Sequence, residues 1–479
     1  MIIQLYRFLL IVALIAAATH AKALTLDEYL REVMKKNRNF QSFEASQEAA
    51  TLRYQQGDLE LSPILSASGN YLDDKALQPS ASGSVVHNEV RQYSLGLAKK
   101  FSTGTSAAVT GTLTANNLEG QLANNGNFVF EDHSSSLGIS LSQSLWKDFF
   151  GHATRLRWER EASQTALEKN SYDLQSKQAL VQAEAIFWDL MYLQQELEIR
   201  KASLERARKI EGWVRERASN GIADRADVLT AQSLVAQREL DVVVSRDNLK
   251  TGEQRLVAQL EWPSEQPIPK LEADLGQIRP LLNFVGGSTG RIVSLDTYLS
   301  VLDAQVKQIN SQEAVDRVRP DLVLSGQYKT NGYDATDPGA LNHINDKDRP
   351  TSAVGVAFTW ALDWDSKNAV RDTARQDALA ARLKKEKGLY DSELAWKELN
   401  RRHGEFSARV EAATNVSQVQ TAKATAERVK LSKGRSITSN VITAEQDAAE
   451  AELNLTRLKA EQRKLESQSR LFVKIQEGT

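Results

Sequence analysis

The sequence predicts a mainly α-helical protein with a smaller set of membrane β-strands, built from two internal repeats of helix, strands and helices. Three observations support this fold class. Segments 219–232 and 432–445 share glycine, valine and threonine at one constant offset. In each half, a proline separates an opening helical segment from a segment of alternating residues. A long proline-free segment with heptad spacing then follows in each half, so one duplicated architecture explains the whole chain.

The composition excludes several classes of function. Charged residues make up 25% of the chain and the formal net charge is -2, so no basic surface points to nucleic acid as a partner. The chain contains no cysteine. Disulfides, thiol catalysis, cysteine-based metal sites and the acylated cysteine of a bacterial lipoprotein are therefore excluded.

Residues 1–23 have the features of a secretory signal peptide. Arg7 precedes an apolar run at 8–18, and Ala21 and Ala23 supply the small residues that a signal peptidase recognises. A membrane anchor is the weaker alternative, because the run is shorter than the roughly 20 apolar residues of a spanning helix. We expect cleavage after Ala23.

Each half then opens with a predicted helix. Thr25 and Ser294 precede similar segments, Leu-Asp-Glu-Tyr-Leu and Leu-Asp-Thr-Tyr-Leu, and both residue types are suited to cap a helix. The helical pattern continues without a predicted break until Pro63 and Pro320 end it.

After each proline the period changes to two. Apolar residues and glycine alternate with small or polar residues in 65–71 and 322–328, and again in 136–146 and 353–362. A half-buried sheet on a soluble core would also give this pattern. The secretory signal, strands of about ten residues and Tyr or Trp near their ends favour strands of an outer-membrane barrel, with apolar faces toward lipid.

The first half holds about 40 additional residues between its matched strands. Part of this excess predicts another hairpin, with alternating residues at 93–97 and 107–114 on either side of a turn at 101–105. We therefore expect four strands in the first half and two in the second. The segments around Gly126 and from Gly332 to Pro350 are expected to form long exposed loops.

The rest of each half predicts a long helical hairpin. Apolar residues recur there at heptad spacing, in the second half as far as Phe472, and this narrow seam is typical of coiled coils. Prolines concentrate in the connection between the halves. The predicted organisation starts with a signal peptide at 1–23 and a first repeat at 24–262, which has strands at about 63–146 and a hairpin at about 154–262. A second repeat at 293–479 has strands at about 320–364 and a hairpin at about 365–475. Between the repeats lies a Pro/Gly-rich linker at 263–292, which contains Pro263, Pro267, Pro269, Pro280, Gly286 and Gly287.

Each predicted hairpin turns at a glycine. Gly221 and Gly434 end one helix, because glycine tolerates a positive φ. Asp227 or Asn440 lies near the start of the next helix, where such side chains can satisfy free amides.

The order of these elements and its repetition resemble the TolC-like outer-membrane efflux protein family, the outer membrane factors, from Leu24 to about Phe472. The resemblance implies a homotrimer whose strands close one transmembrane β-barrel and whose helices continue as a coiled-coil tunnel across the periplasm. It implies an outer-membrane channel of a tripartite efflux or type I secretion system. The implied partners are a periplasmic adaptor (membrane fusion) protein, an inner-membrane transporter and outer-membrane lipid.

The resemblance also implies roles for the hairpin tips. Gly221 and Gly434 match the family's tip glycines, where adaptors dock. Asp227 matches an aspartate of the network that holds the tunnel entrance shut. Asp224, Arg225, Asp227, Arg435 and Asn440 are therefore the candidate entrance gate, and simply solvated tip charges are the alternative.

Two features depart from the family pattern. Leu431, Ser436, Asn440 and Thr443 stand where the family's best-known member has a tyrosine, an arginine and two aspartates, so the family's own gate is not expected here. Family members supply four strands per subunit, whereas six per subunit would give a wider barrel of eighteen strands in a trimer. The alternative is that the extra hairpin folds over the outer mouth.

The sequence predicts neither an enzyme nor a cofactor. The histidines outside the signal segment are scattered, with no two at ligand spacing, and no phosphate-binding glycine loop, nucleophile elbow or dinucleotide fingerprint occurs. The main alternative is a secreted or periplasmic coiled-coil structural protein without a channel, and a binding module without a channel is another. The cargo is left open among drugs, metals and proteins.

Overall fold

The computed structural model describes residues 24–476, apart from 81–82, 123, 125, 264–267, 269, 277–278, 282–289 and 347. The predicted signal peptide and much of the predicted linker, including Pro267, Pro269 and Gly286–Gly287, lie outside the described residues. The chain divides into two compact units. We call them the helical unit (Met1–Gln47, Asn170–Leu299 and Glu386–Thr479) and the sheet unit (Glu48–Lys169 and Ser300–Lys385).

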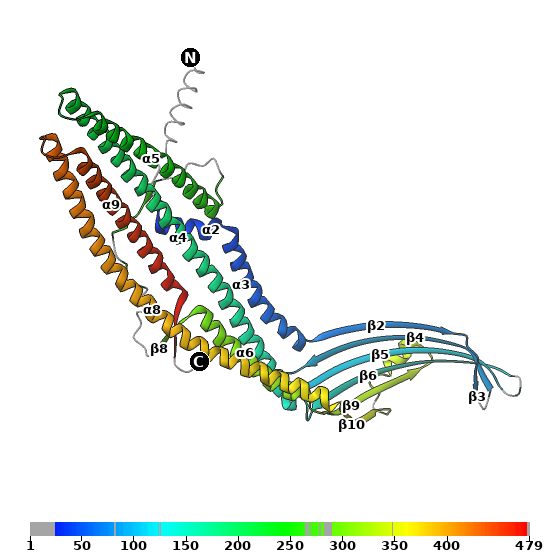
Figure 1. Ribbon diagram of the computed structural model, residues 1–479. Helices are drawn as coiled ribbons and strands as arrows, with labels where there is room; N and C mark the ends of the chain where they lie inside the picture. Colours follow the sequence, from blue (N-terminus) through cyan, green and yellow to red (C-terminus); the bar gives the residue numbers. More distant parts are fainter. Residues whose placement is uncertain are drawn as a thin grey trace, which may run out of the picture. The chain divides into compact units, whose positions relative to one another are not determined.

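The helices and strands are labelled in Figure 1. The α-helices are α2 (Leu26–Lys36), α3 (Arg38–Gln56), α4 (His152–Ser219), α5 (Arg225–Leu260), α6 (Leu295–Arg317), α7 (Asp337–Asn342), α8 (Trp364–Ser432) and α9 (Thr438–Ser467). The strands are β1 (Leu24–Thr25), β2 (Ile64–Asp74), β3 (Gln78–Ser80), β4 (Gly83–Lys100), β5 (Thr105–Leu122), β6 (Asn127–Ser144), β7 (Leu271–Glu272), β8 (Gly290–Ser294), β9 (Asp321–Asp334), β10 (Thr351–Thr359) and β11 (Phe472–Gln476). Short 3-10 helices occupy Gly57–Leu61, Phe149–Gly151 and Gln468–Leu471.

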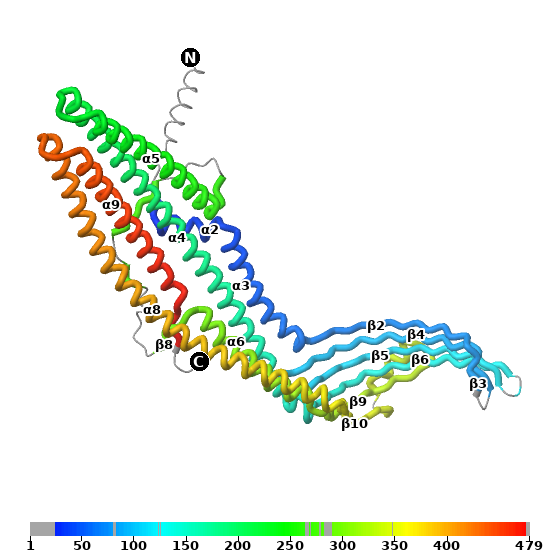
Figure 2. The backbone as a smooth tube through the Cα atoms, in the orientation of Figure 1, coloured from blue at the N-terminus to red at the C-terminus, as the bar shows by residue number. Residues whose placement is uncertain are grey.

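Two helical hairpins form most of the helical unit. The end of α4 with α5 makes the first hairpin, and the end of α8 with α9 makes the second (Figure 2). Helices α5 and α9 pack against each other. The predicted heptad line of α5 faces the interior, because Val242 and Leu256 are buried and Val228, Val235 and Leu249 pack partly buried against the same apolar clusters.

An apolar core lies where α2 meets the first hairpin. Tyr29, Phe187 and Trp188 are almost fully buried there with Leu256 and Leu260. The rings of Tyr29 and Phe187 have centroids 5.5 Å apart. Such aromatic side chains bury a large apolar area, so this cluster fixes the base of the hairpin.

The opening helices begin as predicted but the first one is interrupted. Thr25 Oγ1 accepts a hydrogen bond from the Glu28 amide at 3.3 Å, and Ser294 Oγ accepts one from the Thr297 amide at 3.2 Å. The prediction of an unbroken first helix is wrong, because Asn37 has an extended backbone between α2 and α3. Its side chain accepts from the Asn39 amide and thereby competes with helical hydrogen bonding.

Short strands that the sequence analysis did not predict complete the helical unit. β1 pairs in parallel with β7, and β8 pairs antiparallel with β11. The expectation that Phe472 continues a helical seam is wrong, because α9 ends at Ser467 and Phe472 pairs with Ser294. Its ring instead lies 5.1 Å from that of Trp396.

The sheet unit contains one antiparallel sheet with the strand order β10-β9-β6-β5-β4-β2, and β3 pairs with part of β4. The six expected strands are thus present. The predicted extra hairpin is β4 with β5, and it lies inside the sheet, between β2 and β6. Its turn contains Gly104 at a φ of 71°, a conformation that favours glycine.

The strands are longer and one loop is shorter than expected. β4, β5 and β6 each contain 18 residues, whereas about ten were predicted. The segment around Gly126 is only a short connection, because β5 ends at Leu122 and β6 begins at Asn127. The second expected loop contains α7, whose Ala340 carbonyl accepts a hydrogen bond from Ser135 Oγ at 2.6 Å.

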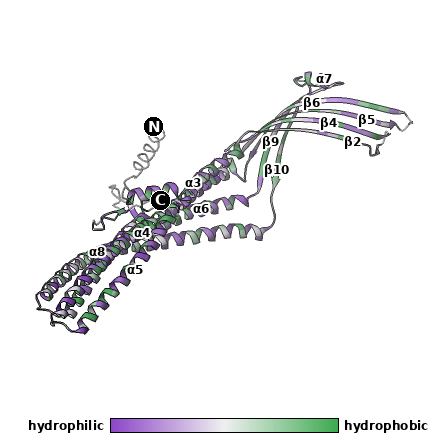
Figure 3. Cartoon of the chain, turned by 90° about the horizontal axis from the view of Figure 1, so that it is seen from above, coloured by the Kyte–Doolittle hydropathy of each residue, from purple (hydrophilic) through white to green (hydrophobic). Residues whose placement is uncertain are grey.

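The strand register separates the sheet into an apolar face and a small, polar face, and Figure 3 shows both kinds of residue along the strands. Residues directly opposite each other in paired strands share a face. The apolar face consists of Leu65, Ala67, Gly69, Tyr71, Tyr93, Leu95, Leu97, Ala107, Val109, Gly111, Leu113, Leu137, Ile139, Leu141, Leu322, Leu324, Gly326, Tyr328, Val354, Val356 and Phe358. Most of its large side chains are exposed, with Leu65 at 71% and Val354 at 83%, whereas Leu113 and Leu322 are half-buried.

Candidate functional site at the hairpin tips

The first hairpin turns through a glycine-terminated helix end. Gly221 has a φ of 71° and donates its amide to the Ala218 carbonyl at 3.0 Å. The Ile222 amide reaches the Arg217 carbonyl at 2.8 Å, so free carbonyls of the last turn of α4 are satisfied. Residues 220–224 then connect directly to α5.

The second hairpin repeats this backbone. Gly434 also has a φ of 71°, its amide reaches the Leu431 carbonyl at 3.0 Å, and the Arg435 amide reaches the Lys430 carbonyl at 2.8 Å. A Cβ at either glycine would meet no atom within 4 Å. The two glycines are therefore required by the turn geometry and present open surface at the tips.

The helices after the tips are capped differently from the prediction. Asp224 is the N-cap of α5, and its carboxylate accepts from the Asp227 amide at 2.8 Å. Asp227 thus supplies the amide and not the cap. The N-cap of α9 is Ile437, which makes no side-chain cap, and Asn440 is exposed beyond it.

The five candidate gate residues are not assembled into a lock within one chain. All residues of the two tips, 217–228 and 430–441, are described, and among them no ion pair joins Asp224, Arg225, Asp227, Arg435 or Asn440. All of them except the half-buried Asp227 are exposed. Their polar groups are therefore available to solvent or to another molecule.

A different set of polar contacts joins the two tips. The Arg217 guanidinium of the first hairpin donates to the Ser436 carbonyl of the second at 3.3 Å. Ser436 Oγ donates to Glu427 at 2.8 Å, and Lys430 Nζ donates to the same carboxylate at 2.6 Å. The hydrogen bond from Lys430, with that from Ser436, lowers the pKa of Glu427 below its usual value of 4.5.

A buried carboxylate behind the tips connects three helices. Glu445 of α9 is 4% exposed, and its Oε2 accepts from Arg206 of α4 at 2.8 Å. Its other oxygen lies 2.7 Å from Arg428 Nε of α8. This cluster was not predicted from the sequence. The available signal was a glutamate four residues after Val441 and three before Ala448, on the apolar seam of α9.

An apolar cluster surrounds the same region. Leu431 is fully buried with Ile210 and Val214 of α4 and with Val441 of α9. Leu431 thus belongs to the packed interior of the hairpin pair. The polar groups Arg217, Glu427 and Glu445 therefore connect helices that already share an apolar core.

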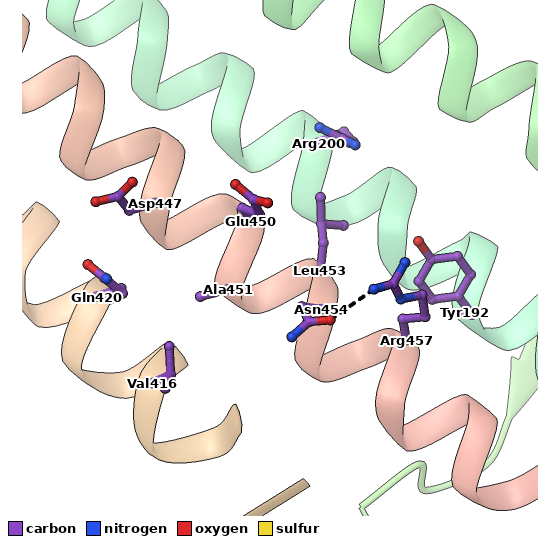
Figure 4. A pocket seen from close by; sticks show the side chains of 10 residues that line it. All are labelled: Tyr192, Arg200, Val416, Gln420, Asp447, Glu450, Ala451, Leu453, Asn454 and Arg457. Carbon is purple, nitrogen blue, oxygen red and sulfur yellow. Dashed lines mark hydrogen bonds between the residues drawn. The ribbon is translucent and has the colours of Figure 1, made fainter. Parts of the chain in front are cut away.

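A groove of about 500 Å³ opens farther along the hairpins, between α4, α8 and α9 (Figure 4). Its charged lining consists of Asp447 and Glu450 toward one end and of Arg200 and Arg457 toward the other. Arg457 is oriented by a 3.0 Å hydrogen bond to the Asn454 side chain. This mixed lining is suited to a polar protein surface, which a charged helix of another molecule would provide.

Among the described residues, no helix combines the length and the apolar character needed to cross a membrane.

The chain resembles solved outer-membrane channels along nearly its whole length. The outer membrane protein VceC from Vibrio cholerae aligns with a TM-score of 0.64 and 14% identity, over 92% of this chain and 94% of that one. The outer-membrane channel OprN aligns with a TM-score of 0.66 and 16% identity, over 93% and 89% of the two chains. CusC, whose transmembrane channel formation has been described, aligns with a TM-score of 0.65 and 12% identity over 94% and 92%. This chain therefore has the fold of these channels, and the resemblance predicted from the sequence is confirmed at the level of fold.

Sequence relationships are more distant. Toxin and drug export protein A from Aggregatibacter actinomycetemcomitans is 21% identical over 260 residues, which is 54% of each protein. The chain thus matches only about half the length of that relative. No protein-family model matches the chain.

Proposed function

We propose that this chain is the outer-membrane subunit of a tripartite export system. Three copies form a channel whose strands lie in the outer membrane and whose helical part lies in the periplasm, and cargo passes through it to the outside. The observation that carries this proposal is the alignment with outer-membrane channels over more than nine-tenths of this chain. The half-length relationship to a toxin and drug export protein supports export as the process.

The surface chemistry of the sheet unit supports the membrane assignment. A water-soluble monomer rarely exposes a large continuous apolar patch. Here one face of the sheet carries a continuous band of apolar side chains, while the other carries mostly serine, threonine, glycine and alanine. Lipid on the first face and water on the second would satisfy both.

The periplasmic partners are proposed to be an adaptor protein and, through it, an inner-membrane transporter. Adaptor docking is assigned to the tips around Gly221 and Gly434, where a Cβ on either glycine would meet no atom within 4 Å. The charged groove at Asp447 and Glu450 extends the same docking surface along the hairpins. Asp224, Arg225, Asp227, Arg435 and Asn440 remain candidates for an entrance gate formed between copies, since no ion pair within the described tip of one chain joins them.

The first experiment is single-channel conductance of the purified protein in planar bilayers, alongside its mass in detergent. We expect steady pores from a species of about three chains. A monomer or dimer without conductance would contradict the proposal and favour the coiled-coil structural protein.

The docking assignment has its own test in cells. Gly221→Glu and Gly434→Glu should abolish export while the trimer and its conductance persist, because a charged side chain then occupies the contact surface. Gly221→Ala and Gly434→Ala are the matched controls, since they place a Cβ on the same residues at positive φ without adding a charge. Normal export in both tip variants would remove these glycines from the docking surface.

A further inference from the structure

We infer that the β4–β5 hairpin is part of the membrane wall, so that three copies of this chain close a barrel of eighteen strands with a wide, hydroxyl-lined bore. This inference rests on the proposed function, which supplies the trimer and the membrane. The hairpin is the part of the first repeat that has no counterpart in the second. The four remaining long strands alone would give twelve strands in three copies.

The pairing pattern places the hairpin in the wall. All eleven residues of β2 pair with β4, from Ile64 opposite Ala98 to Asp74 opposite Asn88. β5 pairs with β6 over nearly its whole length. β2 and β6 are therefore separated by the hairpin, and moving it over the mouth would break both ladders. In lipid, every backbone group must be satisfied by such pairing.

The apolar face continues across the hairpin without a gap. Leu95 lies opposite Ala67 on one side and Gly111 on the other, and Val109 lies opposite Ile139. Leu95 and Val109 are exposed, as are their counterparts in the flanking strands. If the hairpin folded over a water-filled mouth, it would expose this apolar row to water, which is unfavourable.

Charged residues delimit the apolar row at both ends. On β4 the row lies between Arg91 and Lys99. The eight residue steps between them span about 27 Å at roughly 3.4 Å each. This length matches the apolar band of about 25 Å that transmembrane barrels present to lipid.

The opposite face of the hairpin is lined with hydroxyl groups in register. The Ser68 and Ser94 hydroxyls are 2.7 Å apart across β2 and β4, and Thr112 lies opposite Ser94. The residues that alternate with the apolar row are Gln92, Ser94, Gly96 and Ala98 on β4 and Ala108, Thr110, Thr112 and Thr114 on β5. This part of the bore is therefore polar and uncharged.

The two edges of the sheet fit a second copy of the same chain. All nine residues of β10 are exposed, as are the residues of β2 up to Asp73, whereas the inner strands are mostly half-buried. Six antiparallel strands leave β2 and β10 running in opposite directions. The β10 edge of one copy can therefore pair antiparallel with β2 of the next, which removes both open edges.

The consequence is a wider passage. Strands about 4.8 Å apart and tilted by about 40° give a backbone diameter of about 36 Å for eighteen strands and about 24 Å for twelve. The extra hairpin thus widens the barrel about 1.5-fold. Such a bore admits bulky polar solutes, including extended polypeptides, without charge selection by the hairpin.

Cysteine accessibility tests the wall directly, because the native chain contains no cysteine. Ser94→Cys and Thr110→Cys lie on the polar face, and Leu95→Cys and Val109→Cys on the apolar face. Ser325→Cys and Leu324→Cys on β9 are the matched controls, whose place in the wall does not depend on the hairpin. Each variant is reconstituted in liposomes and treated with a charged, water-soluble thiol reagent.

We expect Ser94→Cys and Thr110→Cys to react as fast as Ser325→Cys, and Leu95→Cys and Val109→Cys to be protected like Leu324→Cys. Labelling of all four hairpin variants with protection of Leu324→Cys would overturn the inference and leave the channel intact. Equal labelling of the two β9 controls would overturn the proposed membrane function itself, and this inference with it.

Polymer exclusion then measures the width. Neutral polymers of graded size are added on the side of the barrel mouth while single-channel current is recorded. The largest polymer that enters should be larger than a twelve-stranded barrel with a backbone diameter of about 24 Å admits. A cutoff at the twelve-strand size would overturn the inference while the conducting channel supports the proposed function.

Discussion

The two hairpin tips have the same backbone but different side-chain support. Gly221 and Gly434 share a φ of 71° and the same pair of terminal hydrogen bonds. The first tip closes on itself, because the Asp224 carboxylate caps α5. The second lacks a side-chain cap at Ile437 and is instead tied to Glu427 of its own helix and to Arg217 of the other hairpin.

This comparison distinguishes the residue that the turn geometry requires, which is glycine, from the contacts that stabilise the turn, which differ between the tips. A left-handed turn residue is needed wherever one helix ends and its partner starts within a few residues, so glycine occurs in both copies. Capping can be replaced by contacts with a neighbouring helix, because either satisfies the free polar groups. The first tip thus depends on local interactions and the second on interactions between hairpins.

The largest effect is expected from the buried carboxylate that joins the hairpins. Glu445→Gln removes one charge between Arg206 and Arg428, and the loss of two charge-assisted contacts at a 4% exposed site should destabilise the region by about 2–3 kcal/mol. Hydrogen exchange of peptides from both tips should rise by roughly 30- to 150-fold, since 1.4 kcal/mol is tenfold.

The second tip should respond to Glu445→Gln more than the first. Glu450→Gln, an exposed glutamate on the same helix, is the control and should leave exchange unchanged. Equal exchange in the two variants would show that Glu445 does not hold the hairpins together.

The turn glycines should give equal effects in the two tips. Gly221→Ala and Gly434→Ala each place a Cβ on a residue at positive φ, which costs about 1–2 kcal/mol, and no neighbouring atom adds a clash. Gly212→Ala is the control of opposite sign, because alanine in an open helical position stabilises by about 0.5–1 kcal/mol. Thermal unfolding and tip exchange measure both. A tip that tolerates alanine would not use the left-handed turn in solution.

The caps should distinguish the tips. Asp224→Ala removes the acceptor of the Asp227 amide and should destabilise the start of α5 by about 1 kcal/mol. Ile437→Asp introduces a cap where none exists and should stabilise the start of α9 by a similar amount. Exchange of the first-turn amides of α5 and α9 reports each change. Effects of the same sign in the two variants would contradict the assigned caps.

Local signals in the sequence predicted the helices, strands and turns, whereas contacts between residues far apart in the chain were not predicted. Glycine and proline positions mark turns because their constraints act on their own backbone. Glu445 and Arg206 are 239 residues apart, so no local pattern could indicate that they pair. Asp224 and Asp227 are both acidic at capping distance, which explains why the sequence did not show which one caps the helix.

For the strands, the local pattern predicted the apolar segments but not the full strand lengths, which depend on pairing with other strands. Apolar alternation revealed the segments that carry the exposed apolar face, including Tyr93 to Leu97. It did not reveal the full length of β4, since its first half carries charged residues such as Glu89 and Arg91. Pairing with β5 extends the strand there independently of hydropathy.

The smallest effect concerns the second tip at low pH. The hydrogen bond from Lys430, with that from Ser436, lowers the pKa of Glu427 in the folded state, so its ionised form stabilises the tip above pH 4.5. This stabilisation is lost as the pH falls below 4.5 through the lowered pKa. Acidification should therefore increase tip exchange in the native protein more than in Glu427→Gln, with exposed Glu411→Gln as the control. The same acid response in the native protein and in Glu427→Gln would show that ionisation of Glu427 does not stabilise the second tip.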